Sequence, residues 1–397
     1  MSHSLTEAGA RRSPAVYALL AVILAWGWQA LTVHYNYGGN WTGLFCTGSL
    51  FAAPPAALNY EHIYRFENSY GYDGQMYHYM AHDPFLTRGF QSSIDAPRFR
   101  YRRILLPLAA WLFAGGQDRF VDAAYYGVVL LSVFLGTLWV GAAVMKEGAH
   151  PAWALGFLTI AGVAVSLDRM TVDVTLAALT AGLFYYSRRE HWGAVFLICA
   201  LAALVRESGL LLAAGMAAWG VRERHWGRAV AFAASAIPAF AWYAYINTRT
   251  PPGPADLLSP FPFFGLLMRL VTPSSYPWGF AMTALVTGLD YAALAGIAIA
   301  VVYCAGHFGR LLKEPYGLVA FAFVALVAFV STPAAWTEAY AFARGYSPLI
   351  LLVALDGFHA RSIAGAWPLA LTAPRIGIQV VGVGGQVLGI VRGLVRW

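Results

Sequence analysis

Charged residues are scarce in this sequence. They make up 11% of its 397 residues, whereas 59% are hydrophobic. A soluble globular protein carries about 25% charged residues, so a soluble enzyme of this size could not cover its surface with so few. The shortage also excludes a disordered chain and a nucleic-acid-binding protein. What remains is an all-α polytopic membrane protein, and at about 20 residues per spanning helix the chain has room for roughly ten spans.

Lysine and cysteine are also rare. Lys146 and Lys313 are the only lysines, so arginine supplies nearly all the positive charge of a chain with net charge +7. Arginine binds phosphate through paired hydrogen bonds, which lysine cannot form. The three cysteines show no spacing typical of a disulfide framework. The first apolar run lacks a clear cleavage site for a signal peptide, so we expect it to be an uncleaved first helix.

The positions of the arginines predict the orientation. Arg11 and Arg12 precede the first apolar run, 14–33, which predicts a cytoplasmic N-terminus. The long polar segment 35–103 then lies outside, which in a bacterium is the periplasm. The apolar run 104–114 is short for a span, and we expect an interfacial helix there. This choice places the other short basic loops inside, as the positive-inside rule prefers.

The remaining apolar runs predict the other helices. We expect them at 120–145, 151–167, 171–187, 192–205, 208–221, 227–247, 281–306, 316–333 and 346–360. A second outer loop is expected at 247–279. Residues 1–360 then form a single transmembrane domain, followed by a basic cytoplasmic tail, 361–397, that lies on the inner membrane surface. The alternative for the tail is an eleventh span in 376–391.

On this topology the ionisable residues collect on one side of the membrane. They come from five distant segments, at 61–103, 168–173, 206–207, 249–269 and 338–344. A transporter would be expected to place charges near the middle of the membrane. Ionisable residues gathered on one side indicate chemistry at the outer membrane surface instead.

The densest polar segment is 70–85. Asp73 lies there between Tyr72 and Gly74, and Asp-Gly is a strong turn signal, so a simple turn is the alternative to a functional carboxylate. A short helix after it would place His78 and His82 on one face. Such a pair could bind zinc, but no third ligand is evident from the sequence.

Several arginines are candidates for binding an anion. Arg102 and Arg103 lead into the apolar run at 104, and a guanidinium matches the geometry of phosphate. Interfacial anchoring is the alternative for both. Arg206 either binds a ligand or forms an internal ion pair with Glu207. Arg344 precedes the last long apolar run and is either a helix-end anchor or a phosphate ligand.

Four strings carry a resemblance to a known family. They are GYDGQ with DPF (71–75 and 83–85), RYRRILLP (100–107), LDRMTVDVTLAAL (167–179) and LVRESGLLL (204–212). In this order they resemble the GT-C superfamily of membrane glycosyltransferases, in a bacterial branch often identified with cell-surface glycopolymers. The resemblance covers roughly residues 14–215, together with ARGYSPLILL (343–352). The chain lacks the WWD-type motif and the soluble C-terminal domain of the larger oligosaccharyltransferases.

The resemblance implies a function and a set of site residues. It implies sugar transfer, with inversion, from a polyprenyl-phosphate donor to a glycan or lipid acceptor of the cell envelope, at the periplasmic face of the inner membrane. Asp73 matches the essential acid of the first loop, and Asp173, or else Asp168, matches the second acid. The candidate donor-phosphate ligands are Arg102, Arg103, Arg206 and Arg344, and the candidate substrate contacts are Tyr72, Gln75, His78, Asp168 and Glu207. No cofactor is certain, and a divalent cation stays open.

Two other functions remain as alternatives. A flippase or transporter of a lipid-linked or anionic solute would need charges inside the membrane, and only Arg206 and Glu207 point that way. An O-antigen polymerase or ligase usually carries its large outer loop late in the chain, whereas the longest one here comes first.

Overall fold

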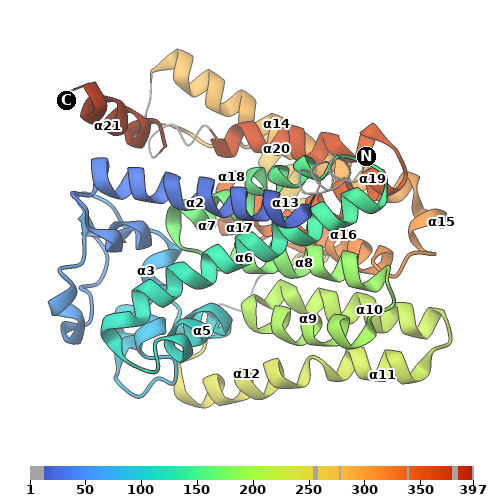
Figure 1. Ribbon diagram of the computed structural model, residues 1–397, viewed down its shortest axis with the longest axis horizontal. Helices are drawn as coiled ribbons and strands as arrows, with labels where there is room; N and C mark the ends of the chain where they lie inside the picture. Colours follow the sequence, from blue (N-terminus) through green and yellow to red (C-terminus); the bar gives the residue numbers. More distant parts are fainter. Residues whose placement is uncertain (1–12, 254–257, 277–278, 338, 378–382, 396–397) are drawn as a thin grey trace, which may run out of the picture.

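The chain folds almost entirely into helices (Figure 1). The computed structural model describes residues 13–253, 258–276, 279–337, 339–377 and 383–395. The α-helices are α2 (Pro14–Asn36), α3 (Asp73–His82), α4 (Pro97–Tyr101), α5 (Leu105–Phe113), α6 (Asp118–Lys146), α7 (Ala161–Arg169), α8 (Asp173–Ser187), α9 (Trp192–Val205), α10 (Leu210–Arg222), α11 (Trp226–Ala234), α12 (Ile237–Arg249), α13 (Phe264–Val271), α14 (Phe280–Gly306), α15 (Phe308–Leu311), α16 (Gly317–Phe329), α17 (Pro333–Trp336), α18 (Ala339–Gly345), α19 (Ser347–His359), α20 (Trp367–Gly377) and α21 (Val383–Val395).

Short elements connect these helices. The 3-10 helices are η1 (Trp41–Phe45), η2 (Ala56–Glu61), η3 (Phe90–Ser93), η4 (Pro151–Thr159), η5 (Glu207–Gly209) and η6 (Ile363–Ala366). Two strands of two residues each, β1 (Thr47–Gly48) and β2 (Arg65–Phe66), pair in parallel within the first loop. Apart from these two short strands, the regular elements of the described residues are all helices, which confirms the predicted all-α fold.

Several helices have the length and composition of membrane spans. Within the described residues, α2, α6, α14 and the continuous segment Trp226–Arg249 are long and apolar enough to cross a membrane. A fifth span results if η4 and α7 are counted as one, although they are bent by 62°. α9, α16 and α19 are apolar but shorter. The chain thus has the character of a helical membrane protein, and the full set of about ten spans stays a prediction.

The bend between η4 and α7 differs from the single helix expected at 151–167. Ile160 has extended backbone angles and separates the two elements. The Gly162 N–H then donates to the hydroxyl of Ser347 in α19, at 2.8 Å. An ideal Cβ on Gly162 would lie 3.1 Å from the Cβ of Asp173, so the bend packs α7 tightly against the start of α8.

Helix α8 lies at the centre of the molecule. It is buried over nearly its whole length and packs against α6, α9 and α19. Figure 1 shows α2, α6 and α8 running side by side, with the first loop and α3 at one end. Asp173 begins α8, and Arg188 follows its last residue and pairs with Glu147. Since 15 residues of α-helix extend about 22 Å, these two charged groups lie at opposite ends of the bundle.

The C-terminal helix α21 packs against the end of α2. The Asn36 side chain at the end of α2 donates to the backbone carbonyl of Gln386, at 3.1 Å. The side-chain amide of Gln386 donates to Asp168 and to Tyr37, which follows α2. α21 therefore lies at the end of α2 that leads into the first loop. The side of the membrane on which the tail lies, and whether 376–391 spans it, stay predictions.

Candidate functional site

Asp73 begins helix α3 rather than forming an isolated turn. Tyr72 is the extended residue that precedes the helix, and Asp73 is its first residue. Gly74 is needed because an ideal Cβ at this position would lie 2.1 Å from the backbone oxygen of Arg169. This contact fixes the start of α3 against the turn between α7 and α8. Asp73 and Asp173 are thereby brought to the same region.

Arginines from three separate segments surround these two carboxylates. Arg100, in α4, pairs with Asp73 at 2.8 Å, and Arg344, in α18, donates to the other oxygen of Asp73 at 2.8 Å. The Nε of Arg344 lies 3.5 Å from Asp173. Arg206, at the break between α9 and η5, donates to Asp173. Arg344 therefore bridges the two carboxylates.

A second row of polar groups adjoins this cluster. Arg103 donates to Glu207 at 3.0 Å and to the hydroxyl of Tyr77 at 3.2 Å. Tyr77 lies one helical turn after Asp73, on the same face of α3. The guanidinium of Arg344 also lies over the ring of Tyr72, 5.3 Å from its centroid.

Close backbone packing positions Arg206 and Glu207. An ideal Cβ on Gly209 would lie 1.9 Å from the carbonyl oxygen of Ala202 in the preceding helix. Glycine at this position lets η5 fold back tightly onto α9. The glycine in RESG is thus explained by packing, and the turn directs the arginine toward Asp173.

The cluster keeps Asp73 ionised and leaves one guanidinium nitrogen without an acceptor among the described residues. Burial raises the pKa of the Asp73 carboxyl, but the charges of Arg100 and Arg344 outweigh this effect and hold the pKa well below its usual range. Asp73 is therefore ionised at neutral pH. Arg344 is 9% exposed, and its Nη1 has no hydrogen-bond acceptor among the described residues. A buried guanidinium nitrogen without an acceptor is costly, and a phosphate oxygen is a suitable partner.

The same geometry does not fit a cation shared by Asp73 and Asp173. Both carboxylates already receive guanidinium groups, and Arg344 lies between them. A divalent ion placed there would be repelled by at least two arginines.

Other predicted site residues have different partners. Gln75 bonds to the backbone of Gly48 and Tyr70 and holds the first loop together. His78 faces Glu61 and Asp122 instead of Asp73. Asp168 and Arg102 also have partners outside the cluster around Asp73. Asp168 pairs with Arg169 and accepts a hydrogen bond from Gln386, and Arg102 lies over the ring of Tyr243.

Tyr77 belongs to the cluster but was not selected from the sequence. Arg100 belongs to it too, and the sequence offered it only as part of RYRRILLP (100–107). Within that string, Arg103 contacts the cluster and Arg102 lies over the ring of Tyr243. For Tyr77, helical spacing was the available signal. Tyr77 is four residues after Asp73 on one helix.

A cavity of about 440 Å³ lies near the segment that carries Arg344. Its lining includes Phe264 and Met268 of α13, together with Pro333 and Trp336 of α17. The Trp336 ring packs 5.3 Å from that of Tyr346, two residues beyond Arg344. One wall residue of the cavity, Trp336, therefore packs against a residue two positions beyond Arg344.

Comparison with family models, curated proteins and solved structures gives no match for this chain.

Proposed function

We propose that this protein transfers a sugar from a polyprenyl-phosphate donor to an envelope glycan or lipid at the outer face of a bacterial inner membrane. The observation that carries the proposal is Arg344. It is buried, it bridges the carboxylates of Asp73 and Asp173, and its Nη1 has no acceptor among the described residues. Together with the GT-C resemblance, this arrangement supports a site for a phosphate next to a carboxylate base.

The donor phosphate would compete with the carboxylates for the arginines. The donor phosphate is a diester with one negative charge, it gains a second charge when its bond to the sugar breaks, and it binds guanidinium groups in a bidentate manner. As Arg344 and Arg206 turn toward it, they stabilise the charge that develops on the phosphate when the bond to the sugar breaks. The phosphate needs little acid catalysis as a leaving group, because its second pKa is about 6.

Asp73 would then act as the base. While Arg100 and Arg344 hold it, its low pKa makes it a weak proton acceptor. Loss of Arg344 to the donor phosphate raises that pKa and makes Asp73 available to the acceptor hydroxyl. Binding of the donor therefore activates the base, and attack from the face opposite the phosphate inverts the anomeric carbon.

The apolar cavity supports a lipid-linked donor. Exposed apolar residues of α13, including Leu267 and Val271, lie beside the residues that line it. An isoprenoid chain could occupy this surface while its phosphate reaches the cluster around Arg344.

Sugar release is the direct test of this function. The purified full-length protein is incubated in nanodiscs with a panel of polyprenyl-phosphate sugars, and the sugar released to acceptor or water is measured. We expect turnover of at least one donor and none of the matching nucleotide sugar. Absence of turnover with every donor, combined with donor movement across a proteoliposome membrane, would contradict the proposal.

One observation favours a transporter as the second candidate. Asp290 lies within α14, which is long enough to span a membrane, and it is 2% exposed. It pairs with Arg269 at 2.9 Å and with Arg375 at 2.7 Å. Buried ionisable groups in a spanning helix are typical of ion and substrate pathways. The proteoliposome assay above separates this function from transfer.

A further inference from the structure

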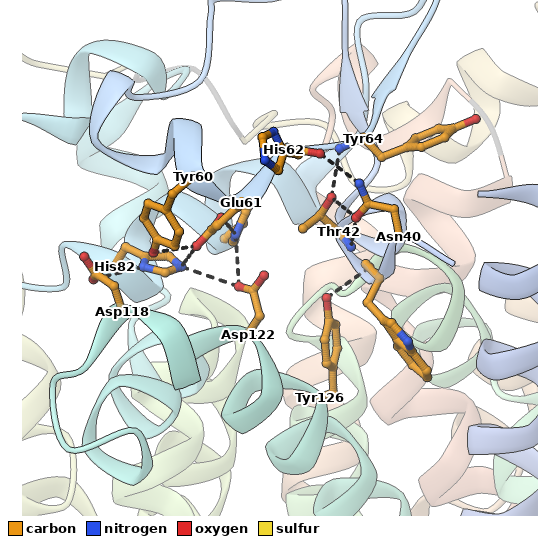
Figure 2. A network of polar contacts seen from close by, with 12 residues as sticks. Asn40, Thr42, Tyr60, Glu61, His62, Tyr64, His82, Asp118, Asp122 and Tyr126 are labelled. Atoms are coloured by element: carbon orange, nitrogen blue, oxygen red, sulfur yellow. Dashed lines mark hydrogen bonds and ion pairs between the residues drawn. The ribbon is translucent and has the colours of Figure 1, made fainter. Parts of the chain in front are cut away.

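A second polar cluster lies in the first loop, separate from the arginine cluster. Glu61 at the end of η2, His78 and His82 in α3, and Asp122 in α6 each bring one possible ligand atom to this cluster, and Figure 2 shows Glu61, His82 and Asp122 facing one another. All four ligand atoms lie within 4.8 Å of one another. Glu61 and Asp122 supply the further ligands that the sequence did not reveal, because both are distant from the histidine pair along the chain.

Four distances between the histidines and the carboxylates of this cluster are close to those between the ligands of a tetrahedral metal ion. The Nε2 of His78 lies 3.0 Å from Asp122 Oδ1 and 3.1 Å from Glu61 Oε2, and the Nε2 of His82 lies 3.2 Å from Glu61 Oε1 and 3.4 Å from Asp122 Oδ1. With metal–ligand bonds of about 2.0–2.1 Å, neighbouring ligands of tetrahedral Zn²⁺ are about 3.3 Å apart.

His78 provides an independent indication of a ligand. Its side chain is completely buried and stacks on the ring of Phe45, with centroids 4.2 Å apart. Neither of its ring nitrogens makes a hydrogen bond within the described residues, although Nε2 is close to two carboxylates. A buried imidazole without hydrogen bonds is costly, whereas a metal ion bound by the four groups would satisfy Nε2.

The groups around the cluster have the arrangement of metal-supporting partners. The Nδ1 of His82 lies 3.1 Å from Asp118, while its Nε2 faces Glu61 and Asp122. Arg88 holds Asp118 with two hydrogen bonds, at 2.7 and 2.9 Å. A carboxylate on the far nitrogen of a histidine is the usual device that orients a metal ligand.

We propose that Glu61, His78, His82 and Asp122 bind one Zn²⁺ ion as a structural site. Two imidazoles and two carboxylates suit this ion, and four protein ligands complete its tetrahedron and leave no position for catalysis. The ion joins three segments: η2, α3 and the start of α6. Since α3 begins with Asp73, the site fixes the helix that carries the proposed base. The inference does not depend on sugar transfer.

Metal binding by the full-length protein tests this site. The protein is purified in detergent, stripped with EDTA, and titrated with ZnCl₂ against a chromophoric chelator. We expect about one Zn²⁺ per chain, a higher unfolding temperature with Zn²⁺, and visible absorption typical of tetrahedral Co²⁺ after Co²⁺ substitution. His78→Ala/His82→Ala should abolish all three, and Asp118→Asn should weaken Zn²⁺ affinity about 10–100-fold.

The matched control is His62→Asn. His62 is adjacent to Glu61 but exposed, so this variant should bind Zn²⁺ like the wild type. If the wild-type protein binds no Zn²⁺, or if the double variant still binds it, the cluster is a network of ion pairs and the inference is wrong. If the double variant fails to fold, the Zn²⁺ affinity of Glu61→Gln and the Zn²⁺ stoichiometry of the wild type decide between a zinc site and a network of ion pairs. A chain that binds Zn²⁺ here but transfers no sugar overturns only the proposed function.

Discussion

Arg344 donates to Asp73 across a separation of 271 residues, at 2.8 Å. The first loop of the chain and the segment before α19 therefore meet in one site. This contact keeps the carboxylate ionised and keeps the guanidinium near the position proposed for the donor phosphate. The two groups restrain each other until an anion competes for the arginine.

Lysine at position 206 or 344 should not support donor binding as well as arginine does. Arg344→Lys and Arg206→Lys keep the charge but lose the bidentate geometry. Each variant should therefore lose one hydrogen bond to the charged phosphate, and such a bond contributes about 1.5–3 kcal/mol. Donor affinity should fall about 10- to 100-fold in a binding titration with a polyprenyl-phosphate sugar. Arg249→Lys, on an exposed residue, is the control. Wild-type affinity in both cluster variants would remove these residues from the phosphate site.

Gly74→Ala should displace helix α3. Its Cβ would overlap the backbone oxygen of Arg169, which cannot move as a side chain could. Overpacking of this kind costs about 1–3 kcal/mol, so the unfolding temperature in detergent should fall and sugar transfer with it. Gly127→Ala, where no atom lies within 4 Å of the new Cβ, should be at least as stable as the wild type. Equal stability of the two variants would contradict the packing described here.

Asp73 should make stability depend on pH in the acid range. Its pKa is lower in the folded than in the unfolded state, where it is about 3.9, so the unfolded chain binds more protons and stability rises with pH. The stability difference between the wild type and Asp73→Asn should be constant between about pH 5 and 7 and should shrink by roughly 1 kcal/mol at about pH 3. A difference that grows on acidification would show that the shift has the opposite sign.

Single cysteines can test the arrangement relative to the membrane. Native Cys46 is unsuitable for labelling because it is buried beside Arg169. In a cysteine-free background, Glu67→Cys should be labelled from outside and Arg189→Cys from the cytoplasm. Val391→Cys in α21 should behave like Glu67→Cys, because α21 lies at the loop end of α2. Labelling of positions 67 and 189 from the same side would contradict the topology.

Sequence patterns predict the helices well because a long apolar run in a membrane must satisfy its backbone hydrogen bonds internally, which an α-helix does. The four helices of span length in the described residues coincide with predicted ones, and the short helix at 105–113 was expected from its length. The break at Ile160 was not predicted, because the surrounding sequence is uniformly apolar. The bend is accompanied by a tertiary hydrogen bond between Gly162 and Ser347, which local sequence does not reveal.

The candidate site was predictable in its main parts and not in its details. The GT-C resemblance singled out Asp73, Asp173, Arg206 and Arg344, and the structure brings all four together. The zinc ligands Glu61 and Asp122 were not predictable, because nothing in their local sequence distinguishes a ligand from an ordinary loop or helix-end acid. Only the fold places them beside the histidines.

The rate of sugar transfer by Asp73→Asn tests the central claim most directly. The substitution keeps the size of the side chain and removes its charge, and Asp95→Asn is the control, since Asp95 also pairs with Arg100 but does not contact Arg344 within the described residues. If Asp73 is the base, transfer should fall by about 10²–10⁴-fold. Donor binding should be kept or strengthened, because Arg344 is released from its carboxylate partner. A folded Asp73→Asn protein with full transfer activity would contradict the account.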